Sequence, residues 1–375
     1  MSVYGVLTLS SLSEVRLLTS STMSGSGSGS GSASSSVRCS MVSVMLLEGN
    51  CEVNGSELGR VTELPGKASV PIFTYYGCKI LIFGNKHAEE VARIVKEGGV
   101  EEEHSGVDSV ESVPGVDECY VVDGDDGDVT AVNVVNTHAQ LEVMRDDCRK
   151  YFNDDQQRQQ LNGGSAPQPQ PQPPRVLIVG NNSTGKLSLL KTLTSYALKV
   201  GRSPLVVNLN PGLSIMSVTP VPGCVGCKVV AGSFDYPTVL SSFTTSDANL
   251  KGDQGGGQRH PLCLFYGNKK IRSNPSFYYE VVSKLGTSVS LRASSCLSKV
   301  ESSNCQRALN EYTSGFIAIG SAECDIEGLE KIVEDLSVNV VIVLDKVSLR
   351  LCVCVCVCDF LLSLFGACVG VFGCV

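Results

Sequence analysis

The residues with the clearest chemical capacity form a glycine-rich turn that ends in a lysine. They follow the apolar run 175–179 and precede a helix-forming segment. The turn consists of Gly180, Asn181, Asn182, Ser183, Thr184, Gly185 and Lys186. In this pattern the glycines let backbone N–H groups turn toward a β-phosphate, and the lysine reaches the β and γ oxygens. The spacing therefore predicts a nucleotide-binding phosphate cradle, with a chance Gly-Lys turn as the alternative.

The residue after the lysine departs from the full pattern. A Ser or Thr there would hold Mg²⁺, but this chain has Leu187. Ser188 follows, yet one further residue along a helix turns a side chain by about 100°. We expect Leu187 and Ser188 to complete the binding loop through the backbone, without forming a metal site. Metal-dependent phosphoryl transfer is correspondingly weakened.

Carboxylates are missing where phosphoryl transfer would need them. The run 205–209 leads into Asn208 and Asn210, and an amide cannot accept a proton at neutral pH. The strand-like run 315–319 ends in Ile319. Glu323 and Asp325 come later in the chain and are the candidates to take the place of the missing carboxylate. We therefore predict no catalytic residue and binding without turnover.

Changes in amino-acid composition and hydrophobic pattern divide the chain into segments. The predicted segments are a disordered Gly/Ser leader (1–36), an N-terminal β-domain (37–135) with an acidic insertion loop (101–128), a helix and Pro/Gln linker (136–175), a P-loop nucleotide-binding domain (176–350) and a Cys-Val tail (351–375). Short apolar runs between turns indicate a small β-sandwich for the N-terminal β-domain. Alternation of apolar strands and helices after 175 indicates a P-loop NTPase-like α/β fold with a parallel sheet.

Charge and cysteine usage set limits on partners. The net charge is −8, so no overall basic field attracts nucleic acid, and any RNA contact has to be local. Eleven of the 17 cysteines are scattered over the first 324 residues, a distribution typical of reduced thiols. Cys224 and Cys227 lack further ligands for zinc, and we interpret them as part of a loop.

The last 25 residues contain six cysteines and a strict Cys-Val alternation over 352–358. A membrane anchor and a metal-binding tract are alternatives, although Asp359 and the lack of histidine count against them. We favour the interpretation that this dinucleotide-repeat-like tail does not belong to a native domain.

Several motifs together carry a family resemblance. The cradle is followed by Val207-Asn-Leu-Asn-Pro211 and Val221-Pro-Gly-Cys224, and preceded by Leu47-Glu-Gly-Asn-Cys-Glu-Val-Asn-Gly55. Over about residues 37–345 the chain resembles the Clp family of P-loop subunits of pre-mRNA 3′-end cleavage complex II (cleavage factor IA). That family is related to polynucleotide 5′-hydroxyl kinases, and from the resemblance we expect its C-terminal domain to be missing from this chain.

The resemblance implies an ATP-binding scaffold subunit of the nuclear mRNA cleavage and polyadenylation machinery, bound to other cleavage-factor subunits and contacting RNA at most indirectly. Whether Mg²⁺ binds together with ATP is left open, and no membrane role is expected. The alternative is an ATP-dependent RNA 5′-hydroxyl kinase, whose active relatives carry Asp at the position of Asn210. The resemblance also makes Glu48 and Lys79 candidates for holding the adenine, with a solvated charge at a strand end as the alternative for Glu48. Arg292 and Arg307 are placed where a kinase lid would lie, with ordinary solvated surface charges as the alternative.

Overall fold

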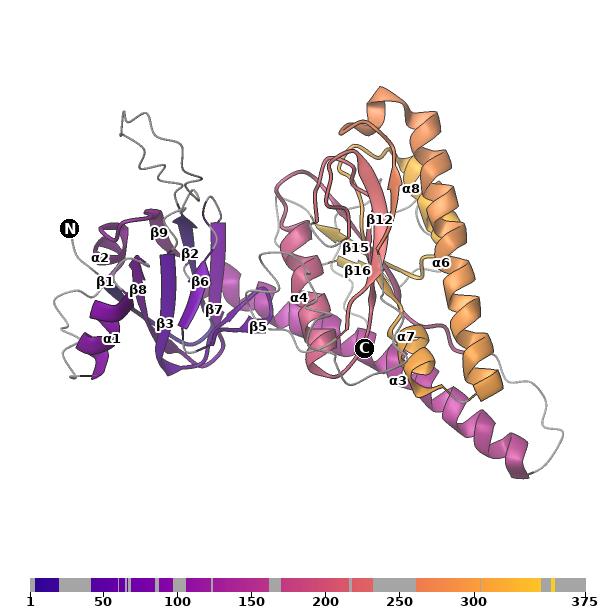
Figure 1. The fold of residues 1–375 in the computed structure, drawn as a ribbon, viewed down its shortest axis with the longest axis horizontal. Coiled ribbons are helices and arrows are strands. Elements are labelled where there is room, and N and C mark those ends of the chain that lie inside the picture. The colour runs from indigo at the N-terminus through magenta and orange to yellow at the C-terminus, as the bar shows by residue number, and fades with distance from the viewer. Residues whose placement is uncertain are drawn as a thin grey trace, which may run out of the picture. The chain divides into compact units, whose positions relative to one another are not determined.

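The structure is a computed structural model. It describes residues 4–19, 42–59, 61–64, 66, 69–84, 88–96, 106–122, 124–161, 170–215, 218–231, 261–303, 305–344 and 352–354. The chain divides into two compact units, and the boundary between them falls at residues 132–133. Figure 1 shows the ribbon of both units.

The first unit is a sandwich of two antiparallel sheets. One sheet has the order β1 (Tyr4–Leu9), β8 (Cys78–Gly84), β3 (Val42–Gly49), β6 (Val61–Leu64). The other has the order β5 (Ser56–Glu57), β4 (Glu52–Val53), β7 (Ser69–Thr74), β2 (Ser13–Thr19), β9 (Val116–Val122). The predicted small N-terminal β-sandwich is thereby confirmed.

Successive side chains of a strand point to opposite faces of its sheet, and this alternation determines which residues pack inside the sandwich. Ile80 and Ile82 of β8 pack with Val15 and Leu17 of β2 in the core shared by the two sheets. Phe83 and its neighbours on the opposite face of β8 pack instead against helix α1 (Ala88–Lys96). Because β8 is covered on both faces, its sequence is apolar without alternation.

The predicted disordered leader is wrong for residues 4–19. β1 pairs with β8, and β2 lies between β7 and β9 in the other sheet. Val15 and Leu17 are fully buried, while the intervening Glu14 and Arg16 form an exposed ion pair of 2.6 Å. This alternation was the available signal for a strand. The Gly/Ser run at 23–36 lies outside the described residues.

The predicted acidic loop 101–128 is also wrong where the structure describes it. Helix α2 (Val107–Glu111) and strand β9 occupy this segment, and helix α3 (Gly124–Leu161) begins in it. Val116 and Cys119 face the core, whereas Asp117 and Glu118 are exposed. Leu18 pairs with Glu118 and Thr19 with Val116, so Asp117 is an extra residue at a β-bulge, and this irregularity lets two consecutive acidic side chains be exposed.

The second unit is built on one seven-stranded sheet. Its order is β13 (Leu262–Phe265), β12 (Cys224–Val229), β11 (Leu205–Asn208), β14 (Phe316–Ile319), β10 (Arg175–Gly180), β15 (Val340–Leu344), β16 (Cys352–Cys354). β11, β14, β10 and β15 are mutually parallel, as predicted, but β12, β13 and β16 add antiparallel edges. The P-loop α/β fold is confirmed, with a mixed and largely parallel sheet.

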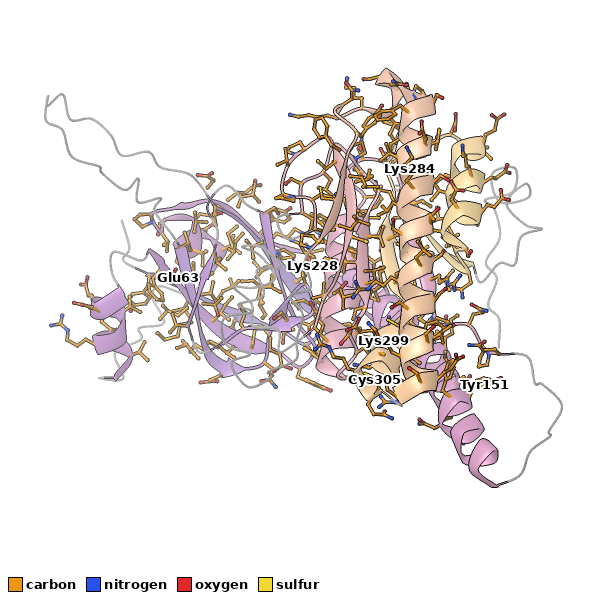
Figure 2. The ribbon with its side chains drawn as sticks, turned by 45° about the vertical axis from the view of Figure 1, so that its right-hand side comes forward. Glu63, Tyr151, Lys228, Lys284, Lys299 and Cys305 are labelled. Atoms are coloured by element: carbon orange, nitrogen blue, oxygen red, sulfur yellow. The ribbon has the colours of Figure 1, made fainter. Side chains whose placement is uncertain are left out.

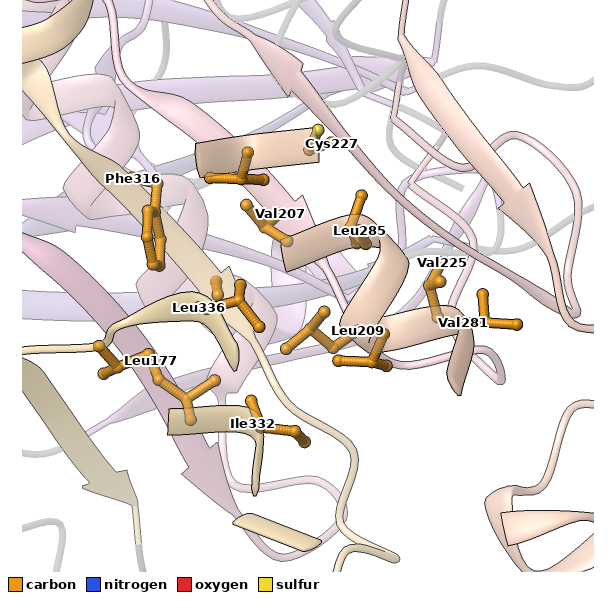
Figure 3. Close-up of a cluster of buried hydrophobic side chains, with 14 of the residues drawn as sticks. Leu177, Val207, Leu209, Val225, Cys227, Val281, Leu285, Phe316, Ile332 and Leu336 are labelled. Atoms are coloured by element: carbon orange, nitrogen blue, oxygen red, sulfur yellow. The ribbon is translucent and has the colours of Figure 1, made fainter. Parts of the chain in front are cut away.

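Helices cover both faces of this sheet (Figure 1). Helix α4 (Lys186–Lys199) contacts β10 and β14 on one face. Helices α6 (Pro275–Ser303) and α8 (Ile326–Leu336) pack on the other. Figure 3 shows that core, in which Leu285 and Ile332 of these helices meet sheet residues such as Leu177 and Phe316. Helix α7 (Gln306–Ser314) packs with α3 and the end of α6.

The start of the Cys-Val tail joins this sheet. Residues 352–354 form β16, which pairs with β15. The interpretation that 351–375 lies outside a native domain therefore fails for these three residues, while 355–375 lie outside the described part of the chain. No helix in the described ranges is both long and apolar enough to cross a membrane.

Candidate functional site

The phosphate cradle occupies the turn between the end of β10 and the start of α4. Gly180 has φ 147° and Gly185 has φ 84°, both in the region that favours glycine. A Cβ on Gly180 would also collide with the carbonyl of Leu344, so no side chain fits there. Ser183 adopts φ 60° as well. The predicted glycine spacing thus corresponds to a tight turn with positive φ angles, and at Gly180 contact with Leu344 leaves no room for a side chain.

Lys186 lies inside the cradle rather than in solvent. Its side chain is largely buried, and Nζ donates to the carbonyl oxygens of Gly180, at 2.7 Å, and Asn181. Burial lowers the pKa of Lys186 below its ordinary value. The ammonium group is therefore held at the centre of the loop, where a phosphate oxygen would meet it.

The first turn of α4 provides backbone donors. Gly185 is the N-cap, and its carbonyl accepts the N–H of Leu189 at 2.9 Å. The N–H groups of the preceding residues have no intrahelical acceptor, so this end of the helix has donors that could bind an anion. Leu187 is half-buried, and Ser188 is exposed on the helix surface. No side-chain oxygen of the residue after Lys186 is available for a metal.

Asn208 stands near where a catalytic carboxylate would be expected, but its side chain braces the loop after β11. It is fully buried at the end of β11, where its Nδ2 donates to Thr219 Oγ1 at 2.6 Å and to the Leu213 carbonyl at 2.9 Å. Its Oδ1 accepts the N–H of Asn210 at 3.0 Å. A carboxylate cannot donate these bonds, so the amide is required to brace the loop after β11. Sequence reasoning missed this because the partners meet only in the folded chain.

Asn210 and the segment after β14 complete this edge of the sheet. Asn210 Oδ1 accepts the N–H of Gly212 at 3.0 Å, so the amide stabilises its own turn. Glu323 Oε2 accepts the N–H of Ile271 at 2.8 Å. Asp325 caps α8 by accepting the N–H of Gly328 at 2.9 Å. Both carboxylates considered as catalytic substitutes are thus engaged in holding backbone.

Arg292 and Arg307 lie at the opposite edge of the sheet from the cradle. Both contact Glu311 of α7, at 3.0 Å and 3.5 Å. Arg292 also lines a pocket of about 60 Å³ beside Arg175 and Gly315, where β10 and β14 begin rather than end. The expectation that they form a lid over the phosphates is therefore wrong.

The Cys224–Cys227 segment is strand β12, not the loop that the sequence suggested. Cys227 belongs to the core between the sheet and α6, and burial raises its pKa to about 11. Within the described part of the chain, no three His, Cys, Asp or Glu residues gather in a way that could hold a metal ion.

Two family models match the chain in adjoining regions. One, described as "mRNA cleavage and polyadenylation factor CLP1 P-loop", matches residues 180–352. The other, "N-terminal beta-sandwich domain of polyadenylation factor", matches residues 35–148. Together they cover the cradle, strands β11 to β15 of the seven-stranded sheet and strands β3 to β9 of the sandwich, while β1, β2 and residues 149–179 lie outside both matches. The chain belongs to the Clp1 family.

Individual Clp1 relatives agree with this assignment. The mRNA cleavage and polyadenylation factor clp1 of Botryotinia fuckeliana is 28% identical over 308 residues, covering 81% of this chain and 52% of the relative. The CLP1 factor of Debaryomyces hansenii is 34% identical over 176 residues, covering 46% of this chain and 31% of the relative. The chain thus spans about half the length or less of these curated relatives.

Solved Clp1 structures share the fold. The wild-type Clp1p–Pcf11p complex matches with a TM-score of 0.57 and 21% identity, over 91% of this chain and 60% of that one. A second Clp1p–Pcf11p structure, described as giving the structural basis for ATP loss in a Gly-to-Arg point mutant, matches with the same TM-score and identity.

The adenine candidates lie in the first unit of this chain. Glu48 of β3 and Lys79 of β8 are directly opposite each other in the antiparallel register, beside an irregularity between Leu46 and Glu48. Glu48 is exposed and Lys79 is half-buried. Their role in holding adenine stays a prediction.

Proposed function

We propose that this chain is an ATP-binding scaffold subunit of the mRNA 3′-end cleavage and polyadenylation machinery, acting without turnover in the nucleus. The observation that carries the proposal is the position of Lys186, held inside a glycine turn at the start of α4. Around it, Leu187 offers no metal ligand and Asn210 offers no base. Such a site binds phosphate but lacks the groups that activate it.

ATP in this proposal acts as a structural ligand. A ligand that binds only the folded protein stabilises it by mass action, about 2.7 kcal/mol when its concentration is 100 times its dissociation constant. The similar Clp1p structure that concerns ATP loss in a point mutant supports the same ligand class. Residues 180–188 bind the phosphates through backbone N–H groups and Lys186, and Glu48 and Lys79 are the proposed adenine contacts.

The proposed partners are other subunits of the cleavage factor. The solved relatives are complexes of Clp1p with Pcf11p, so a Pcf11-like subunit is the first partner to test. A scaffold held rigid by nucleotide presents a fixed surface to such a subunit, which lowers the entropy cost of association.

The alternative is an ATP-dependent RNA 5′-hydroxyl kinase. It requires Ser188, Glu323 or Asp325 to take over the metal and base roles. Ser188 is exposed on α4, and both carboxylates already accept backbone N–H groups. Recruiting either carboxylate breaks the contact that holds a neighbouring element, which favours the scaffold over the kinase.

A transfer assay separates the two functions. Purified protein is incubated with γ-labelled ATP, Mg²⁺ and a 5′-hydroxyl RNA, with Lys186→Ala as the paired variant. We expect ATP to stay bound to the unmodified chain and to be lost from the variant, with no label on the RNA. Label transfer that disappears in Lys186→Ala would establish the kinase and overturn the scaffold proposal.

A further inference from the structure

An exposed cationic loop lies at the same edge of the sheet as the cradle. The cationic loop is residues 267–274, between β13 and α6, and it includes helix η4 (Ile271–Ser273). β13 is antiparallel to β12, which is antiparallel to β11, so β13 and β11 end at one edge. A Cβ on Gly212 would lie 3.1 Å from the Lys269 carbonyl, and Ile271 donates its N–H to Glu323. The loop therefore contacts the segments that follow β11 and β14.

The cations of this loop form no ion pairs in the described part of the chain, although the Glu323 carboxylate accepts the backbone N–H of Ile271 between them. The three cations are Lys269, Lys270 and Arg272, all exposed. None of them forms an ion pair with any residue in the described ranges. Two exposed cations of α6 are paired by contrast, Lys284 with Glu280 at 2.7 Å and Arg292 with Glu311 at 3.0 Å. In a chain of net charge −8, three adjacent unpaired cations form a local anion-attracting patch.

Buried contacts hold the backbone of the cationic loop in place. The hydroxyl of Tyr266 lies within hydrogen-bonding distance of the carbonyl oxygens of Lys270, Ile271 and Asn274, at 3.0 to 3.2 Å. The N–H groups of Tyr266 and Gly267 both donate to the Gly223 carbonyl at 2.9 Å. Because the loop is ordered in advance, a ligand that binds its cations loses less entropy in ordering it.

Two exposed aromatic rings flank the patch. Phe265, at the end of β13, is 70% exposed, and its ring lies over Gly267, where a Cβ would be 3.4 Å away. Phe277, in the first turn of α6, is 39% exposed and stacks on Tyr266 with centroids 6.0 Å apart. An exposed ring beside cations has the composition of a surface that stacks a base and holds its phosphates.

We propose that this surface, Phe265 and Phe277 with the cationic loop, binds single-stranded RNA directly. Cations alone would also suit an acidic peptide, but the two aromatic rings favour a ligand that has flat bases as well as negative charge. The inference goes beyond the proposed function, because a scaffold that holds ATP and a protein partner requires no RNA contact of its own.

Fluorescence anisotropy on the full chain tests the proposal. The probe is a labelled unstructured oligouridine of about 10 nucleotides, titrated at several salt concentrations. The test variant is Lys269→Ala with Lys270→Ala and Arg272→Ala. A charge-matched control removes Lys150, Lys284 and Lys299, which are exposed on α3 and α6. Figure 2 labels Lys284 and Lys299 on α6, and Lys299 is roughly 36 Å along the helix from its start.

Phe265→Ala is paired with Leu291→Ala, whose side chain is 66% exposed.

The cationic-loop variant is expected to lose at least about tenfold in affinity, and its salt slope should fall by about 2, since each single-strand phosphate contact contributes about 0.7. Phe265→Ala should lose about tenfold, and both controls should bind like the unmodified chain. Retained ATP is measured in every variant, so failure of the proposed function is seen separately from failure of RNA binding.

Equal losses in the cationic-loop variant and its charge-matched control would overturn the proposal, as would absence of binding by the unmodified chain. Unchanged binding by Phe265→Ala, together with equal competition by a polyglutamate peptide, would assign the surface to an acidic protein segment instead of RNA.

Discussion

Leu187 occupies the position at which the full phosphate-binding motif has its metal ligand. It directly follows Lys186 at the start of α4 and is half-buried. A hydroxyl at this position is the usual Mg²⁺ ligand of the motif. The Leu187→Ser variant should therefore bind ATP about tenfold more tightly in Mg²⁺ than in a chelator. The unmodified chain should show little difference between the two conditions in calorimetric titration.

Ser188→Ala is the matched control, because Ser188 is exposed and one residue further along the helix. It should leave the Mg²⁺ dependence of ATP affinity unchanged. If Leu187→Ser gains nothing from Mg²⁺ while Ser188→Ala loses affinity, then Ser188 is the metal ligand and the kinase alternative is strengthened.

The cradle could be predicted from residues because its constraints are local. Gly180 and Gly185 need their backbone angles, and Lys186 needs its place in the next turn, so spacing alone carries the information. Asn208 could not be predicted in the same way. Its partners Leu213 and Thr219 meet it only in the folded loop.

At the scale of elements, an ion-pair network attaches α3 to the P-loop unit. Arg145 is fully buried and donates to Glu142 at 2.5 Å and to the Ser314 carbonyl at 3.1 Å. Arg202, just before β11, donates to the other oxygen of Glu142 at 2.8 Å and to Asp146 at 2.6 Å. Removing one partner of such a network leaves the remaining charges unbalanced.

Arg202→Ala should therefore lower the free energy of unfolding by about 2 kcal/mol, since Glu142 is mostly buried but Asp146 is half exposed. Lys284→Ala breaks a surface pair and should cost less than about 1 kcal/mol. Urea unfolding measures both. Equal costs for the two variants would mean that the network does not attach α3.

His138 makes the same helix sensitive to pH. Its ring is 5.4 Å from that of Tyr196 on α4, and its Nδ1 is buried with no hydrogen-bond partner in the described part of the chain. Burial lowers the pKa of His138, while Glu142 raises it and the nearby arginines lower it. The unfolded chain then binds the proton more readily than the folded one, so stability falls as pH drops below the ordinary value of 6.5.

His138→Asn removes this titration. Between about pH 7 and pH 5, the unmodified chain should lose stability relative to the variant, by at most about 1.4 kcal/mol per pH unit. Urea unfolding at each pH gives the difference. Parallel stability profiles for the two proteins would exclude His138 as the titrating group.

Strands that are continuously apolar could be predicted from the sequence. Strands that are only half buried could not, because they are recognised only once their partner strands are known. The run before Gly180 could be assigned to a buried strand from its composition. β2 alternates buried Val15 and Leu17 with charged neighbours over only seven residues, and such short half-buried strands resemble loops until their partners are known. β9 was obscured in the same way by its exposed acids.

At the scale of the whole molecule, the first 19 residues supply two strands of the sandwich. β2 is an interior strand between β7 and β9, so its removal would separate two neighbours and expose their edges. Deletion of residues 1–20 should therefore unfold the first unit, detected as rapid proteolysis of the 42–122 region. If that region survived proteolysis, residues 1–20 would be dispensable for folding, as the sequence suggested.

A point variant provides the control for this deletion. Leu17→Asp places a charge at a fully buried position of β2 and should produce the same protease sensitivity. Leu18→Asp, at the half-buried neighbour that faces away from the core, should be far milder. Similar effects of the two substitutions would contradict the register of β2.

The most direct test of the whole account is the identity of the nucleotide that the purified chain carries after incubation with ATP and Mg²⁺. Ion-exchange chromatography of the denatured protein measures it. We expect a stoichiometric amount of intact ATP on the unmodified chain and almost none on Lys186→Ala. Recovery of ADP from the unmodified chain, or equal nucleotide on both proteins, would contradict a cradle that binds ATP without turning it over.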